Sequence, residues 1–100
     1  MTSAAMRYRS IFAPGLFAGQ VAVVTGGGSG IGRCTAHELA ALGATVAIVG
    51  RKIDKLESVR AEIESAGGVC STHVCDIREE AQVQDTVSAV LARHGRIDAL

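Results

Sequence analysis

This sequence of 100 residues has little proline, few aromatic side chains and no excess of charge of either sign. It contains one proline, no tryptophan and 3% aromatic residues, and its 10 basic side chains balance its 10 acidic ones. Without a basic excess, the chain lacks the electrostatic signature of a nucleic-acid-binding protein. No apolar run approaches the ~20 residues that a membrane-spanning helix needs. We therefore expect neither a nucleic-acid partner nor a membrane partner.

Cysteine is also scarce, with three residues at positions 34, 70 and 75. An odd number without a Cys-x-x-Cys pair argues against a disulfide framework and against a zinc site. The histidines at positions 37, 73 and 94 are scattered and predict no metal cluster. We interpret the cysteines as small, semi-buried core residues and the histidines as surface or cap positions. This cysteine usage indicates a reducing compartment, and we expect a cytoplasmic protein.

The sequence does have apolar residues, 48% of the total, and 12 glycines, and these two features organise the chain. Along the chain, short continuous apolar runs typical of buried strands alternate with segments in which apolar residues recur at helical spacing. Strands are predicted over residues 21–24, 45–49, 69–75 and 97–100. Helices are predicted from 30 to 42, from Asp54 to the glycine pair at 67 and 68, and from Asp76 to Gly95. This alternation predicts one α/β domain, a Rossmann-type doubly wound parallel sheet with strand order 3-2-1-4.

The helix boundaries carry their own signals. In the first helix, Ile31, Cys34, Leu39 and Leu42 lie near one apolar stripe, and a glycine at 43 is placed for a left-handed C-cap. Asp54 with Glu57, and Asp76 with Glu79, have the spacing of a capping box at the start of the next two helices. We expect residues 1–19 to be an irregular arm before the first strand. Because the fourth strand begins only at 97, we expect residues 20–100 to be the N-terminal part of a longer domain.

Five of the glycines lie within residues 26–32, where the first strand gives way to the first helix. A glycine-rich loop in this position is typical of dinucleotide binding, because the backbone must approach a pyrophosphate closely and the helix N-terminus attracts it. A plain turn would need only one or two glycines. The candidate cofactor-binding residues of the loop are Thr25, Gly26, Gly28, Ser29, Gly30, Ile31 and Gly32.

The end of the second strand predicts which cofactor is bound. Enzymes that use NAD carry an acid there, which binds the ribose 2′-hydroxyl. This chain has Gly50 instead, followed by Arg51 and Lys52, and a guanidinium can hold the 2′-phosphate of NADP(H) in a bidentate manner. The alternative is a solvated basic turn without a ligand. We expect NADP(H).

The spacing Thr25-Gly26-x3-Gly30-x-Gly32 resembles the cofactor loop of the short-chain dehydrogenase/reductase family. Residues 20–24 are similar to the first strand of that family, and residues 95–100 resemble the segment that leads into its Asn-Asn-Ala-Gly motif. The resemblance implies that Asp76 contacts the adenine and that Ile77 packs nearby. It also implies a small-molecule substrate and a homo-oligomer in the full-length protein. From its sequence spacing alone, a helix cap suffices to explain Asp76, and a cap and an adenine contact are compatible because they use different lone pairs.

Residues 8–17 resemble the N-terminal extension of the peroxisomal trans-2-enoyl-CoA reductase branch of the family and its bacterial relatives. This branch implies NADPH-dependent reduction of enoyl thioesters, with a peroxisomal location in a eukaryote. The family's catalytic Ser and Tyr-x3-Lys have no counterpart here, because Tyr8 is the only tyrosine and residue 12 is Phe. We therefore predict a cofactor site and no catalytic residue within this chain. The alternatives are an NADP-dependent alcohol, ketone or 3-oxoacyl dehydrogenase/reductase, and a nucleotide-binding protein without catalysis.

Overall fold

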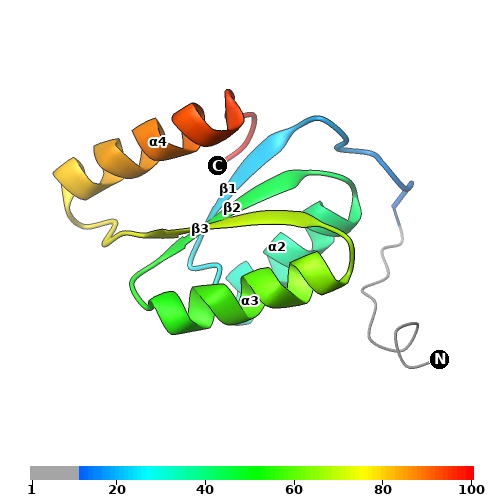
Figure 1. Ribbon diagram of the computed structural model, residues 1–100, viewed down its shortest axis with the longest axis horizontal. Coiled ribbons are helices and arrows are strands. Elements are labelled where there is room, and N and C mark those ends of the chain that lie inside the picture. The colour runs from blue at the N-terminus through cyan, green and yellow to red at the C-terminus, as the bar shows by residue number, and fades with distance from the viewer. Residues whose placement is uncertain (1–11) are drawn as a thin grey trace.

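The computed structural model describes residues 12–100, which form one parallel sheet with helices on both faces (Figure 1). The strands are β1 (Val21–Thr25), β2 (Thr45–Gly50) and β3 (Val69–Val74), and the helices are α2 (Gly30–Ala41), α3 (Ile53–Ser65) and α4 (Glu80–His94). The sheet order is β1-β2-β3, and both pairings are parallel. The predicted Rossmann-type α/β fold is therefore confirmed.

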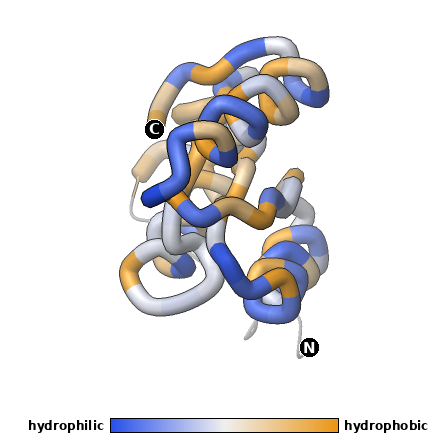
Figure 2. Tube along the Cα trace, turned by 90° about the vertical axis from the view of Figure 1, so that its left-hand side faces the viewer, coloured by the Kyte–Doolittle hydropathy of each residue, from blue (hydrophilic) through white to orange (hydrophobic). Residues whose placement is uncertain are grey.

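The two faces of the sheet bury different residues, because side chains alternate along a strand. On the face covered by α2 and α3, Val46 and Ile48 of β2 pack with Leu56, Val59 and other apolar side chains. On the opposite face, Ala47 and Val49 pack with Val90 of α4 and their neighbours. Figure 2 shows the hydrophobic strands between the two helical layers. Because β2 is covered on both faces, it is apolar nearly throughout.

The predicted fourth strand is only partly present. Residue 99 forms a single parallel bridge with Ala22, and the backbone N–H of Val23 donates to the carbonyl of Ala99 over 2.9 Å. This bridge places the segment beside β1, on the edge away from β2, as the order 3-2-1-4 requires. The predicted strand over 97–100 is confirmed only as this one bridge, because an isolated bridge does not make a ladder.

The predicted capping boxes are also wrong. Helix α3 begins at Ile53 with Lys52 as its N-cap, and α4 begins at Glu80 with Glu79 as its N-cap; neither cap residue makes a side-chain hydrogen bond to the helix. Glu57 instead accepts hydrogen bonds from Arg60 and from Thr72 of β3. The boxes are excluded by where the helices begin, because Asp54 lies inside α3 and Asp76 lies before the N-cap of α4. The predicted left-handed glycine at 43, just after α2, is confirmed by its φ of 97°.

The predicted apolar stripe of α2 is confirmed at Leu39, which packs against the core, and at Leu42, which is buried, and it is wrong at Ile31 and Cys34. Ile31 is 86% exposed and Cys34 is exposed, whereas Ala36 is fully buried. A small residue faces the sheet here because the helix lies close to β1 and β2. The description of the cysteines as core residues holds for Cys70 and Cys75 and is wrong for Cys34.

The described part of the N-terminal arm, residues 12–19, forms turns rather than a regular element. The backbone N–H of Phe17 donates to the carbonyl of Leu42 over 2.9 Å, and its ring packs against the core beneath α2. Residues 8–11, which carry part of the predicted resemblance of the arm, lie outside the described residues. No helix in the described range is long and apolar enough to span a membrane.

Candidate cofactor site

The candidate residues gather at one edge of the sheet. Parallel strands bring their carboxyl ends to the same edge, and there β1 leads to the glycine loop, β2 to Arg51 and β3 to Asp76. Backbone hydrogen bonds join these segments: Gly26 donates to the carbonyl of Val49, and Cys75 donates to that of Gly50, both over 2.8 Å. The crevice outside the carboxyl ends of the strands is where open α/β sheets bind ligands.

The glycine loop contains two kinds of glycine. Gly26 and Gly30 have φ values of 68° and 57°, and a Cβ at either would point into open space. A Cβ at Gly27 would lie 2.7 Å from the Cβ of Ile48, and a Cβ at Gly32 would overlap the carbonyl of Gly26. Packing inside the protein therefore explains Gly27 and Gly32, while the open positions are the ones free to meet a ligand.

The N-terminus of α2 presents free donors. The first hydrogen bond at this end runs from the backbone N–H of Arg33 to the carbonyl of Ser29, so the three N–H groups before it have no partner within the helix. Ser29 is extended and its side chain makes no cap hydrogen bond. The first turn contains no acid. These donors and the positive end of the helix dipole suit a phosphate.

Arg51 and Lys52 lie at this edge as well, in the exposed turn between β2 and α3. Arg51 is close enough to Asp76 for its charge to help hold the pKa of that carboxyl low. The larger cause is Arg78, whose guanidinium and backbone N–H both donate to the Asp76 carboxylate, and together these contacts lower the pKa of Asp76 to about 2. The carboxylate is thus ionised at neutral pH and is available only as an acceptor.

The structure places the remaining predicted residues as follows. The backbone N–H of Asp76 donates to Gln82 Oε1 over 2.8 Å, so this aspartate organises the turn before α4 without a capping box. Ile77 is 60% exposed at the same edge. Thr25 is exposed at the end of β1. The adenine contact predicted for Asp76 and Ile77 remains a prediction.

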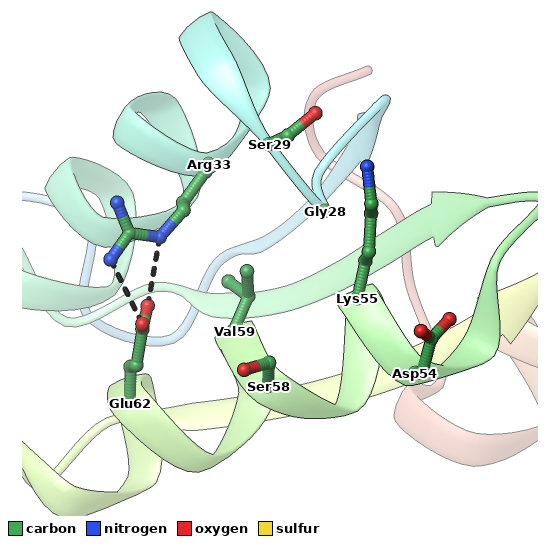
Figure 3. Close-up of a pocket in the computed structure, with 8 residues that line it drawn as sticks. All are labelled: Gly28, Ser29, Arg33, Asp54, Lys55, Ser58, Val59 and Glu62. Atoms are coloured by element: carbon green, nitrogen blue, oxygen red, sulfur yellow. Dashed lines mark hydrogen bonds and ion pairs between the residues drawn. The ribbon is translucent and has the colours of Figure 1, made fainter.

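A pocket of about 300 Å³ opens between the glycine loop and helices α2 and α3 (Figure 3). Gly28 and Ser29 form its loop side, and Arg33 is held across it by Glu62, with nitrogen–oxygen distances of 3.0 and 2.9 Å. Lys55 and Ser58 of α3 line the other wall. The sequence motifs do not single out these α2 and α3 residues as part of the site. In the sequence these residues are marked only by their helical spacing. That spacing does not show which part of the protein their side of the helix faces.

Within the described residues, no group of three or more His, Cys, Asp or Glu side chains could hold a metal ion. The histidines are not simple surface or cap positions. His37 contacts Glu62, and both His73 and His94 contact the buried hydroxyl of Ser71, each over 2.9 Å. These histidine contacts link helices and strands of the fold. They involve none of the predicted cofactor-binding side chains.

Comparison with known proteins agrees with this geometry. Residues 20–100 match the family model described as short chain dehydrogenase. Over 87 residues the chain is 41% identical to a probable 2,4-dienoyl-CoA reductase of the (3E)-enoyl-CoA-producing type from Caenorhabditis elegans, and the match covers 86% of this chain. The match covers only 28% of that relative, so this chain corresponds to less than a third of its length.

Solved structures are similar over the same region. A citronellol catabolism dehydrogenase of Pseudomonas aeruginosa PAO1 is 63% identical with a TM-score of 0.88, covering 90% of this chain and 38% of that one. A metagenomic short-chain oxidoreductase in complex with NADP is 44% identical with a TM-score of 0.81, covering 84% and 38%. An NAD⁺-bound xylitol dehydrogenase is 36% identical with a TM-score of 0.79, covering 82% and 32%.

The family model spans the sheet, the glycine loop and the helix that the loop begins. The solved relatives share this fold, and cofactors are bound in two of them. The chain therefore belongs to the short-chain dehydrogenase family.

Proposed function

We propose that this chain forms the cofactor-binding part of an NADP(H)-dependent oxidoreductase. The observation that carries the proposal is the edge of the sheet where the free N–H groups of the α2 N-terminus lie near a turn with two cations, Arg51 and Lys52. Enzymes that bind NAD carry an acid at the end of the second strand, which binds the ribose 2′-hydroxyl. This chain has Gly50 at that position. Both features favour a ligand with several phosphates, including one at the 2′ position.

Each part of the site has a separate task. The backbone of Gly30 and the N–H groups beyond it hold the pyrophosphate, Arg51 and Lys52 hold the 2′-phosphate, and Asp76 accepts from the adenine amino group. The nicotinamide of the bound cofactor supplies or accepts a hydride. A proton donor must act beside it, and we propose that this donor lies in the part of the protein that corresponds to the remaining length of the relatives. The substrate pocket is proposed to lie there too.

Two substrate classes are supported by different relatives. Reduction of trans-2-enoyl-CoA thioesters is supported by the relative named as a dienoyl-CoA reductase and by the resemblance of the N-terminal arm. Oxidation of an acyclic alcohol, or the reverse reduction, is supported by the higher identity of 63% to a dehydrogenase of citronellol catabolism. Both classes are small molecules with apolar chains. The homo-oligomeric state and the cellular location stay predictions.

The cofactor proposal is tested by titrating the full-length protein with NADPH and with NADH and following the fluorescence of each. We expect NADPH to bind at least about tenfold more tightly, as expected for a charge-assisted contact to the 2′-phosphate. Arg51→Asp should reverse the preference, because it repels the phosphate and offers an acceptor to the 2′-hydroxyl. Equal affinities in the unaltered protein would refute the proposed NADP(H) preference.

The substrate proposal is tested with crotonyl-CoA, citronellol and a panel of ketones, measuring cofactor oxidation or reduction. Turnover of crotonyl-CoA alone would assign the enoyl thioester class, and turnover of citronellol alone would assign the alcohol class. Tight NADPH binding with no turnover on any of them would favour the third alternative, a nucleotide-binding protein of this fold without catalysis.

A further inference from the structure

The pocket beside the glycine loop has one cation that no protein group neutralises. Arg33 is paired with Glu62 through two hydrogen bonds, whereas the Lys55 ammonium has no hydrogen bond or ion pair among the described residues, 12–100. Figure 3 shows the Lys55 side chain extending from α3 towards the loop at Gly28 and Ser29. A lysine ammonium in such a position is free to meet an anion.

The contact between this helix and the loop is close and depends on a glycine. A Cβ built on Gly28 would lie 3.1 Å from the Cβ of Lys55 and 3.6 Å from its carbonyl carbon. A side chain at position 28 would push the first turns of α3 away from the loop by a few tenths of an ångström. The packing therefore fixes the base of Lys55 beside the segment that leads into the N-terminus of α2.

We propose that Lys55 is a further specificity-determining residue, which contacts the 2′-phosphate of NADP(H) from the α3 side of the pocket. This inference rests on the proposed function. Arg51 approaches the phosphate from the turn after β2, and Lys55 approaches it from the next helix, so the 2′-phosphate is bound by cations on two elements. Asp54 also borders the pocket. Its carboxylate repels the phosphate and confines it to the Gly28–Ser29 side.

The test measures dissociation constants of NADPH and NADH for Lys55→Gln in the full-length protein. We expect the dissociation constant of NADPH to rise about tenfold, the effect of losing one charge-assisted contact, while that of NADH stays within about twofold. Lys55→Arg should keep most of the preference because it keeps the charge. Adenosine 2′,5′-bisphosphate and 5′-AMP are titrated in parallel. The two ligands differ only in the 2′-phosphate and lack the nicotinamide half, so the difference in their affinities reports the 2′-phosphate contact alone.

The matched control is Arg60→Gln. Arg60 lies on the same helix and carries the same charge, but it pairs with Glu57 and Glu64 and does not line the pocket. It should change neither affinity. Our inference is overturned if Lys55→Gln leaves the NADPH/NADH ratio unchanged, or if it weakens both cofactors equally. If the unaltered protein shows no preference for NADPH, the proposed cofactor specificity fails as well, so the two failures are distinguishable.

Discussion

Gly30, like Gly26, is a residue of the glycine loop whose conformation and surroundings both point to a ligand, and Gly30 begins helix α2. Its φ of 57° lies in the left-handed region that disfavours side chains, and a Cβ there would enter open space rather than the protein. The neighbouring Gly27 and Gly32 differ, since Ile48 and the backbone of Gly26 already fill the space beside them. A substitution at Gly30 therefore tests ligand binding without disturbing the packing inside the protein.

We predict that Gly30→Val reduces NADPH binding by at least about a hundredfold, because the side chain occupies the phosphate position and strains the loop. Isothermal calorimetry measures the binding, and circular dichroism shows whether the sheet is kept. Gly67→Val is the matched control: Gly67 also has a positive φ, 92°, and open space around it, but it follows α3 at the far end. Normal cofactor binding by Gly30→Val would place the phosphate elsewhere.

At the scale of elements, a polar cluster joins β3 to α4 on one side of the sheet. The Ser71 hydroxyl is buried and lies 2.9 Å from Nε2 of His73 and 2.9 Å from Nε2 of His94. The hydroxyl has one proton, so it can donate to only one ring and must accept from the other. This arrangement suits two neutral imidazoles. The pKa of each histidine is lowered, chiefly by burial; at His73 the nearby charges of His94 and Arg93 add to the effect, and at His94 that of Arg93 does.

The lowered pKa values predict a pH dependence of stability. Below about pH 6.5 a histidine in the unfolded chain binds a proton, whereas the folded cluster resists protonation. The unfolded state then binds more protons, so the free energy of unfolding falls as the pH drops from about 6.5 through the folded pKa values. Above that window the contribution of the cluster is complete.

We predict that His73→Gln makes the free energy of unfolding less dependent on pH below about 6.5, while leaving a residue able to bond Ser71. Urea unfolding at a series of pH values measures the slope in the unaltered protein and in the variant. The comparison at pH 8 is the internal control, because both imidazoles are neutral there in either state. An unchanged slope would mean that the His73 side chain does not retain its lowered pKa in solution.

At the scale of the whole molecule, the loops of the site come from three strands, so a bound cofactor ties together much of the sheet edge. A ligand that binds only the folded state raises the free energy of unfolding by about 2.7 kcal/mol at 100 times its dissociation constant. We predict that equal concentrations of NADPH and NADH raise the melting temperature of the full-length protein unequally, with NADPH giving the larger shift. Differential scanning fluorimetry measures both shifts.

Gly30→Val should lose the NADPH shift, and Gly67→Val should keep it. Because melting reports binding without turnover, this measurement is independent of the substrate and of the catalytic residues. Equal shifts for the two cofactors would contradict the preference inferred from Arg51, Lys52 and Lys55.

The sequence by itself determined the alternation of strands and helices, the parallel sheet and the glycine loop. These are local properties: apolar β-branched runs favour strands, and glycine is needed where φ is positive. The sequence also determined that Arg51 follows the second strand, since chain order alone places it at the carboxyl edge.

Only the tertiary structure decided which side chains meet. Helix α3 begins at Ile53 rather than after Asp54, and Glu57 accepts a hydrogen bond from Thr72 of β3 instead of forming the predicted capping box. The close approach of α2 to the sheet buries Ala36 and leaves Ile31 exposed. The contact of Gly28 with Lys55 joins residues 27 positions apart in the sequence. Helical spacing shows which residues share a face, but the surface that this face meets is set by packing against the rest of the fold.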